Sequence, residues 1–184
     1  MNRATLFLLL LFFSACKVSS HPDKTRDGSW ASGITTTTLH NLYKLNDSIY
    51  RSEQPDADAF HYLSSIGIKT VLDLRDSHSD TPFFKANSFT YFNVPIITRN
   101  FNDSEVVQSL RIIKNSPKPI LVHCKRGSDR TGLVVAMYRI IFENWSKEKA
   151  LEEMKNGGYG FHTRFHNIPA YIEKVNIATI KQML

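Results

Sequence analysis

Apolar residues recur along this chain in two alternating patterns, one typical of strands and the other of helices. Short apolar segments on either side of Asn46 predict a hairpin, and the wholly apolar segment 120–122 suits the middle of a sheet. The strands expected in chain order cover 42–45, 49–52, 70–74, 91–94 and 120–122. We therefore expect a sheet that begins with a hairpin and is completed by later segments.

Between these strands, apolar residues at every third or fourth position predict helices. Asp56 and Asp103 can each cap a helix by accepting a backbone N–H, and two further helices are expected to begin at Ser146 and Asn167. The segment 131–142 is apolar on nearly every side, so a helix there must be buried on all sides. Strands that alternate with helices indicate an α/β domain whose central, mostly parallel sheet is flanked by helices.

The first 15 residues have the pattern of a signal peptide. Arg3 precedes an apolar run over 6–13, and the small residues Ser14 and Ala15 follow it. A helix that spans a bilayer needs about 20 apolar residues, and this run is much shorter. We therefore expect residues 1–15 to direct export and not to cross the membrane.

Residues 13–16, Phe-Ser-Ala-Cys, resemble the processing box of bacterial lipoproteins, whose cysteine becomes the lipidated first residue. The resemblance implies that Cys16 is lipidated and that the protein is anchored to a membrane, facing the periplasm or the cell exterior. Without lipidation the protein would be secreted. The polar, Ser/Thr-rich segment 16–38 is expected to be a tether, and 39–184 to form the folded domain.

Composition narrows the class of protein further. The 184 residues are 42% hydrophobic and 22% charged, which is typical of one globular domain. Two cysteines are too few for a disulfide-rich scaffold or a cysteine-based zinc site. The formal charge of +6 favours anionic partners, but it is too modest to indicate nucleic acid.

The residues with the clearest chemistry, His-Cys-Lys-Arg-Gly-Ser-Asp-Arg-Thr at 123–131, lie between the predicted buried strand and the predicted buried helix. A loop that leads into a helix N-terminus presents successive backbone N–H groups, which bind oxyanions. The same field, together with Arg130, favours the nucleophilic thiolate form of Cys124. The planar fork of Arg130 can hold two phosphate oxygens, and Gly127 permits backbone torsions closed to other residues.

This Cys-x5-Arg pattern, preceded by His123 and followed by Thr131, resembles the protein tyrosine phosphatase superfamily. The resemblance implies that Cys124 attacks phosphorus, that Thr131 helps to expel the thiolate, and that His123 tunes the cysteine. The residues implied to bind the phosphoryl group are Lys125, Arg126, Gly127, Ser128, Asp129 and Arg130. Segments 49–55, 67–75 and 120–131 together resemble the atypical dual-specificity phosphatases of plants, fungi and bacteria, some relatives of which cleave inositol pyrophosphates.

One expected residue, the general acid, is missing from its usual place. Such phosphatases usually supply an Asp about 30 residues before the cysteine to protonate the leaving oxygen, but segment 94–100 contains no acid. Asp103 and Asp129 are the two main candidates, and Asp80 is a third. Asp103 can equally be a helix cap, and Asp129 resembles the suspected acid of bacterial phosphatases with a Lys-Asp-Arg-Thr-like loop. A weak acid would favour pyrophosphates or aryl phosphates, because their leaving groups need little protonation.

The sequence therefore predicts a phosphatase that acts through a phosphocysteine intermediate and needs no metal or cofactor. Phosphorylated protein, inositol phosphate and a lipid headgroup all remain possible substrates. Two other readings stay open: a phosphate-binding module without turnover, and a sulfur transferase that uses the same cysteine. A rim of basic side chains either suits a substrate with several phosphates or is simply solvated. It comprises Arg99, Lys125, Arg126, His162, Arg164 and His166.

Overall fold

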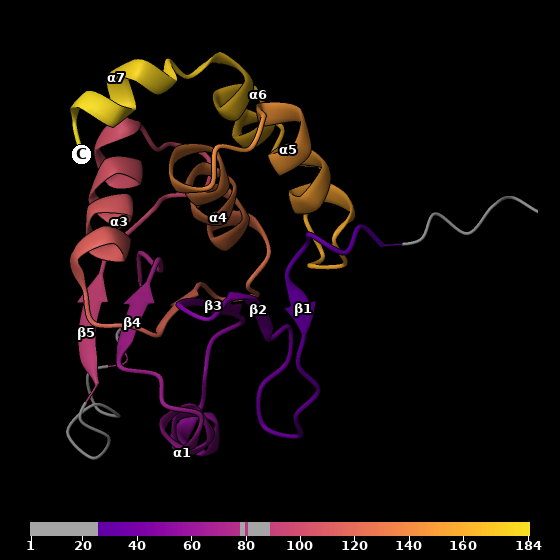
Figure 1. Ribbon diagram of the computed structural model, residues 1–184, viewed down its shortest axis with the longest axis vertical. Coiled ribbons are helices and arrows are strands. Elements are labelled where there is room, and N and C mark those ends of the chain that lie inside the picture. The colour runs from indigo at the N-terminus through magenta and orange to yellow at the C-terminus, as the bar shows by residue number, and fades with distance from the viewer. Residues whose placement is uncertain (1–25, 78–79, 81–88) are drawn as a thin grey trace, which may run out of the picture.

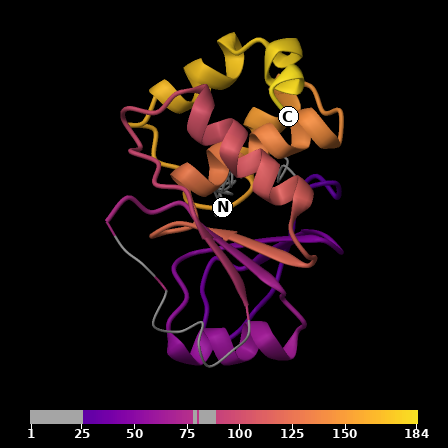
Figure 2. The ribbon, with the colours of Figure 1, turned by 90° about the vertical axis from the view of Figure 1, so that its left-hand side faces the viewer.

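The computed structural model describes residues 26–77, 80 and 89–184. A six-stranded sheet lies between helix α1 on one face and helices α3 to α7 on the other (Figures 1 and 2). The strand order is β1-β2-β3-β6-β4-β5; the first three strands are antiparallel to each other and the last four are parallel. In chain order the strands are β1 (Ser32–Gly33), β2 (Tyr43–Asn46), β3 (Ile49–Ser52), β4 (Thr70–Asp73), β5 (Thr90–Asn93) and β6 (Ile120–His123). The predicted fold class and the predicted hairpin are confirmed.

The helices follow the predicted order. They are α1 (Ala57–Ser65), α3 (Asp103–Asn115), α4 (Asp129–Phe142), α5 (Lys147–Asn156), α6 (Asn167–Lys174) and α7 (Ile177–Gln182). The sequence did not predict α7 as a separate helix. The chain leaves α6 at Val175, and Asn176 begins α7 by accepting the backbone N–H of Thr179.

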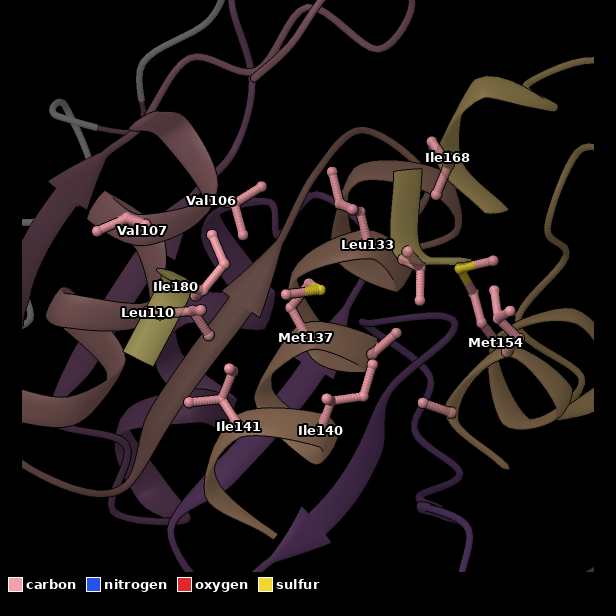
Figure 3. Packing of buried hydrophobic residues seen from close by; sticks show 14 residues of the cluster. Val106, Val107, Leu110, Leu133, Met137, Ile140, Ile141, Met154, Ile168 and Ile180 are labelled. Carbon is pink, nitrogen blue, oxygen red and sulfur yellow. The ribbon is translucent and has the colours of Figure 1, made fainter. Parts of the chain in front are cut away.

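Helix α4 is the centre of the larger core, as its apolar sequence predicts. Leu133, Met137 and Ile140 pack among side chains from α3, α5 and α6 (Figure 3). On the opposite side of the helix, Val134 packs against the sheet residue Val122. Because each buried side chain of this size stabilises the fold by about 1.5–3 kcal/mol, α4 is held firmly, and so is the loop that precedes it.

The other face of the sheet is covered by α1. Asp56 accepts the backbone N–H of Ala59 and so caps this helix as predicted. Phe60 and Leu63 then pack against Val71 and Leu121 from the two central strands. Strand β6 is therefore buried on both faces, which explains why its sequence is wholly apolar before His123.

The folded domain begins earlier than the sequence predicts. Residues 26–38, expected to be part of a tether, pack on the domain: the N–H of Ala31 donates to Glu153 Oε1 at 2.8 Å, and β1 pairs with β2. The guanidinium of Arg26 lies over the rings of Tyr43 and Tyr159 and donates to the carbonyl of Gly157. Because a few polar contacts hold this segment on the domain, it needs few apolar residues. Its composition therefore resembles that of a linker. The predicted signal peptide and Cys16 lie outside the described residues.

Candidate active site

The segment 123–131 lies where the sequence places it, between β6 and α4. Ser52 of β3, His123 of β6 and Asp73 of β4 stand side by side at the carboxyl ends of three parallel strands. The loop 124–128 leaves the sheet at this edge, and α4 begins at Asp129. Ligand sites of open parallel sheets form at such an edge, because adjacent chains diverge there.

Gly127 lets the loop fold closely over the end of β3. Its φ of +69° lies in the left-handed region, and a Cβ at this position would lie 2.5 Å from the carbonyl carbon and oxygen of Ser52. The Gly127 carbonyl also accepts a 2.6 Å hydrogen bond from Arg51 Nη2. Gly127 therefore contacts two residues of β3: its backbone lies against Ser52, and its carbonyl binds Arg51. A side chain at position 127 cannot be accommodated without moving the backbone.

Arg51 is a buried cation behind the loop. Its side chain is 1% exposed, and its guanidinium carbon lies 3.7 Å from the centre of the Tyr159 ring. Burial lowers the pKa of Arg51, and the nearby acidic groups Tyr159, Glu153 and Cys124 oppose that effect. The positive charge of Arg51 therefore acts on Cys124 from below the loop, in addition to supporting Gly127.

Cys124 forms the base of the site. The residue is 3% exposed and packs with Leu74, Ile96 and Val134, so only a small part of the sulfur atom can be reached from solvent. The positive charge of Arg51 acts on the Cys124 side chain, and the apolar neighbours keep water away from the sulfur. A thiol placed in this way suits attack on a small group that enters the loop.

Arg130 is oriented by three acceptors that all contact one of its nitrogens. Nη1 lies 2.9 Å from Asp76 Oδ1 and donates to the carbonyls of Leu74 and Ile96 at 3.4 and 3.5 Å. Among the described residues, Nε and Nη2 have no hydrogen-bond partner. Two donors of the planar fork therefore remain free to bind oxygen atoms of an anion, as predicted for a phosphate ligand.

Thr131 supplies a further free donor in the first turn of α4. Its side chain is fully buried, and its hydroxyl has no partner within the part of the chain that the structure describes. A buried hydroxyl without a partner is uncommon and often marks a functional position. The expected role of Thr131 toward the thiolate stays a prediction.

A buried acidic network holds His123. His123 Nε2 lies 3.0 Å from Asp80 Oδ2, and neither side chain is exposed to solvent. Asp73 accepts the N–H of Arg75 at 2.8 Å and the hydroxyl of Tyr91 at 3.1 Å, and burial raises the pKa of its carboxyl. One ligand atom from each of Asp73, Asp80 and His123 lies within 4.8 Å of the others, a set that could hold a cation. Because donors already contact both oxygens of Asp73, we interpret the three residues as an electrostatic support for His123.

The three candidate general acids lie in different surroundings. Asp80 is buried in the network just described and is not exposed at the mouth of the site. Asp103 accepts a 2.7 Å hydrogen bond from Tyr171 and lines a cavity together with residues of α6 and with Val175 and Asn176; no residue of the loop lines this cavity. Asp103 is also not the cap of α3, because Asn102 takes that position in a capping box with Glu105. The sequence could not separate two adjacent residues with similar capping preference.

Asp129, the first residue of α4, is the candidate that lies directly next to the loop. Its carboxylate accepts the backbone N–H of His162 at 2.9 Å, and the ring Nδ1 of His162 lies 3.0 Å from its Oδ2. The sequence marked His162 only as part of a basic rim, and no local pattern could pair two residues that are 33 positions apart.

The remaining loop residues form the rim. Lys125 and Arg126 are exposed, as expected of a basic rim. The Ser128 hydroxyl points away from the rim and donates to the Tyr159 carbonyl at 2.7 Å. A cavity of about 570 Å³ lies beside the loop. It is lined by Asn41, Tyr43, Glu53, Arg126, Ser128, Gly158, Tyr159, Gly160 and His162.

The sequence pattern of the tyrosine phosphatase family matches residues 38–183. The chain belongs to this family. The match includes the entire loop and nearly the whole sheet, so the prediction of a cysteine-dependent phosphatase is confirmed. The family match gives no support to the hypothesis of a binding module without turnover or to that of a sulfur transferase.

Two curated relatives are similar over most of their length. The chain is 33% identical to the dual specificity protein phosphatase TpbA of Pseudomonas aeruginosa, over 83% of this chain and 70% of the relative. It is 28% identical to the inositol diphosphatase DSP3 of Arabidopsis thaliana, over 78% of this chain and 74% of the relative.

Solved structures agree with this family membership. The crystal structure of P. aeruginosa TpbA matches with a TM-score of 0.78 and 31% identity, covering 86% of this chain and 98% of that protein. The catalytic domain of the PP-IP phosphatase SIW14 from S. cerevisiae matches with a TM-score of 0.71 and 25% identity, covering 81% of this chain and 93% of that domain.

Proposed function

We propose that this chain hydrolyses aryl phosphates and phosphoanhydrides through a phosphocysteine intermediate on Cys124. The observation that carries the proposal is the arrangement of Arg130: Asp76 and the carbonyls of Leu74 and Ile96 hold one nitrogen, and among the described residues the other two nitrogens have no partner. The side chains of the same Leu74 and Ile96 pack with the buried Cys124. A phosphoryl group in the loop would receive hydrogen bonds from the backbone amides and from this fork. Such donors stabilise the charge on the equatorial oxygens in the transition state.

The reaction proceeds in two steps. In the first step the Cys124 sulfur bonds to phosphorus while the bond from phosphorus to the leaving oxygen breaks, and that oxygen takes up a proton. In the second step water attacks phosphorus, the sulfur–phosphorus bond breaks, and inorganic phosphate leaves. The unpartnered hydroxyl of Thr131 stabilises the departing thiolate by donating a hydrogen bond to it.

Two observations support this substrate preference. Segment 94–100, which passes Arg130 at Ile96, contains no carboxylic acid to protonate a basic leaving oxygen. A phosphate that leaves from a pyrophosphate needs little protonation, and a phenol needs less than an alcohol does. The names of the relatives agree with both classes: TpbA has been crystallised with pTyr, and the plant relatives are inositol diphosphatases.

We further propose that the protein is exported and held at a membrane by a lipid on Cys16. The support is the N-terminal sequence, in which an apolar run and small residues precede Cys16. Within the described residues, no helix combines the length and the hydrophobicity that a bilayer crossing requires. Cys16→Ser is expected to move the protein from the membrane fraction of a bacterial host to the soluble fraction. An unchanged distribution contradicts the lipid anchor.

Phosphate release tests the proposed reaction. The purified protein is expected to release phosphate from 4-nitrophenyl phosphate and from an inositol pyrophosphate faster than from phosphoserine peptides. Cys124→Ser should abolish all release while leaving the thermal unfolding temperature close to that of the wild type. Equal rates on phosphoserine peptides contradict the substrate preference, and activity that survives in Cys124→Ser contradicts the mechanism. A parallel assay for thiocyanate tests the sulfur-transferase alternative.

A further inference from the structure

Asp129 and His162 form a pair of titratable groups next to the loop, and the proposed reaction gives this pair no role. His162 donates its backbone N–H to Asp129 Oδ1 at 2.9 Å, and its ring Nδ1 lies 3.1 Å from Oδ1 and 3.0 Å from Oδ2. Both oxygens of the carboxylate therefore face nitrogen atoms of the same residue. With a hydrogen on Nδ1, both oxygens accept a hydrogen bond from His162.

The carboxylate also determines which ring nitrogen of His162 is left free. With a hydrogen on Nδ1 directed at Asp129, any second proton of the ring sits on Nε2. Nε2 has no hydrogen-bond partner within residues 26–77, 80 and 89–184, and 31% of the side chain is exposed. The ring therefore has one nitrogen fixed by the loop and the other available to a bound molecule.

Three contacts place His162 beside the loop. The Tyr159 carbonyl accepts hydrogen bonds from the Ser128 hydroxyl at 2.7 Å and from Asn41 Nδ2 at 3.0 Å. The same Asn41 amide also donates to the Arg126 carbonyl at 2.7 Å, which ties the segment around Tyr159 to the rim. His162 then lines the 570 Å³ cavity together with Arg126 and Ser128. A leaving group that extends from the loop into this cavity would therefore lie beside His162.

We propose that His162 donates the proton to the leaving oxygen and that Asp129 is its positioning residue. The inference rests on the proposed phosphatase reaction and answers the absence of an acid from segment 94–100. A carboxylate that orients an imidazole through Nδ1, so that Nε2 transfers the proton, is a known solution in other enzymes. Here the two residues come from the loop and from a segment more than 30 positions later.

The protons balance over the two steps. In the first step the sulfur–phosphorus bond forms, the phosphorus–oxygen bond breaks, and the proton on Nε2 moves to the leaving oxygen, so that His162 becomes neutral. In the second step neutral His162 accepts a proton from the attacking water as the sulfur–phosphorus bond breaks. Inorganic phosphate leaves, and both the Cys124 thiolate and the protonated His162 are restored.

The test uses His162→Asn in the full chain and compares leaving groups of different basicity. The Asn amide can still donate to Asp129 at the position of Nδ1, but it has no group at the position of Nε2. We expect kcat/KM for phenyl phosphate to fall by about 100-fold, the lower end of general acid effects, and kcat/KM for 4-nitrophenyl phosphate to fall much less. The ratio of the two constants within one variant does not depend on how much of the protein is folded.

Two further variants complete the design. His166→Asn is the matched control, because His166 lines a different cavity beside α5 and α6; its ratio should equal that of the wild type. Asp129→Asn should shift the ratio in the same direction as His162→Asn, but less. A fall in His162→Asn that is equal for both substrates overturns the inference and leaves the phosphatase reaction intact. A wild-type ratio in His162→Asn combined with a large shift in Asp129→Asn makes Asp129 the acid itself. Activity that survives in Cys124→Ser is the separate result that removes the underlying reaction.

Discussion

Replacing Gly127 with alanine tests whether the close contact between the loop and β3 sets the geometry of the site. The φ of +69° at Gly127 costs a residue with a side chain about 1–2 kcal/mol of stability. The added Cβ would also lie 2.5 Å from the Ser52 carbonyl, where ordinary contacts begin at 3.4 Å. The loop would have to move by most of an ångström, and crowding of this kind costs about 1–3 kcal/mol more.

Gly67→Ala is the matched control. Gly67 has a similar φ of +81°, but a Cβ there would meet no atom within 4 Å. Both variants carry the backbone cost, and only Gly127→Ala carries the clash and the displacement of the loop. We therefore expect Gly67→Ala to lose about 1–2 kcal/mol of unfolding free energy with unchanged kcat/KM. Gly127→Ala should lose about 2–5 kcal/mol and, because a displacement near 1 Å disturbs the reacting geometry, about 100-fold in kcat/KM.

The assay combines urea unfolding with turnover of 4-nitrophenyl phosphate at a temperature where both variants are folded. A kcat/KM for Gly127→Ala within threefold of the Gly67→Ala value would contradict this prediction. That result would mean that the loop tolerates a side chain against β3 or that its exact position is unimportant for catalysis.

Two more predictions concern the groups around the loop. Asp76→Asn removes the charged acceptor of Arg130 Nη1. The kcat for 4-nitrophenyl phosphate should fall roughly tenfold, while the free energy of unfolding changes by less than about 1 kcal/mol. A rise in kcat would instead show that Asp76 competes with the substrate for Arg130. Burial and the charge of Glu153 raise the pKa of Tyr159 from 10.0 to about 12. The unfolded chain therefore ionises this phenol first, so its contribution to stability is complete below pH 10 and is lost as the pH rises toward 12. Urea midpoints measured over that range should fall less steeply in Tyr159→Phe; an identical slope contradicts the assignment.

The sequence was most informative where a single segment determines its own structure. The apolar run of β6, the hairpin at Asn46 and the all-round hydrophobicity of α4 each predict an element without reference to the rest of the chain. The sequence also pointed to Cys124 and Arg130 as candidate site residues, because one short segment between two buried elements contains both.

The parts that the sequence missed depend on contacts between distant segments. The fixing of Arg26 and Ala31 on Tyr159 and Glu153 involves partners more than 120 positions away. Composition alone therefore suggested a tether where the chain is part of the domain. The sequence could not predict the contact between Asp129 and His162 for the same reason. The ion pair between Asp76 and Arg130 likewise joins residues that are 54 positions apart.

The docking of the N-terminal segment has a consequence for where the enzyme works. Arg26 is fixed to Tyr159, whose ring lies against Arg51 directly behind the catalytic loop. About ten residues join Cys16 to this point, and an extended chain of that length reaches at most about 35 Å. A lipid on Cys16, as proposed, would thus confine the catalytic mouth to a thin shell of solvent next to the bilayer. Phosphorylated groups displayed on neighbouring membrane proteins or lipids would then be encountered at high local concentration, and molecules in the bulk would compete poorly with them.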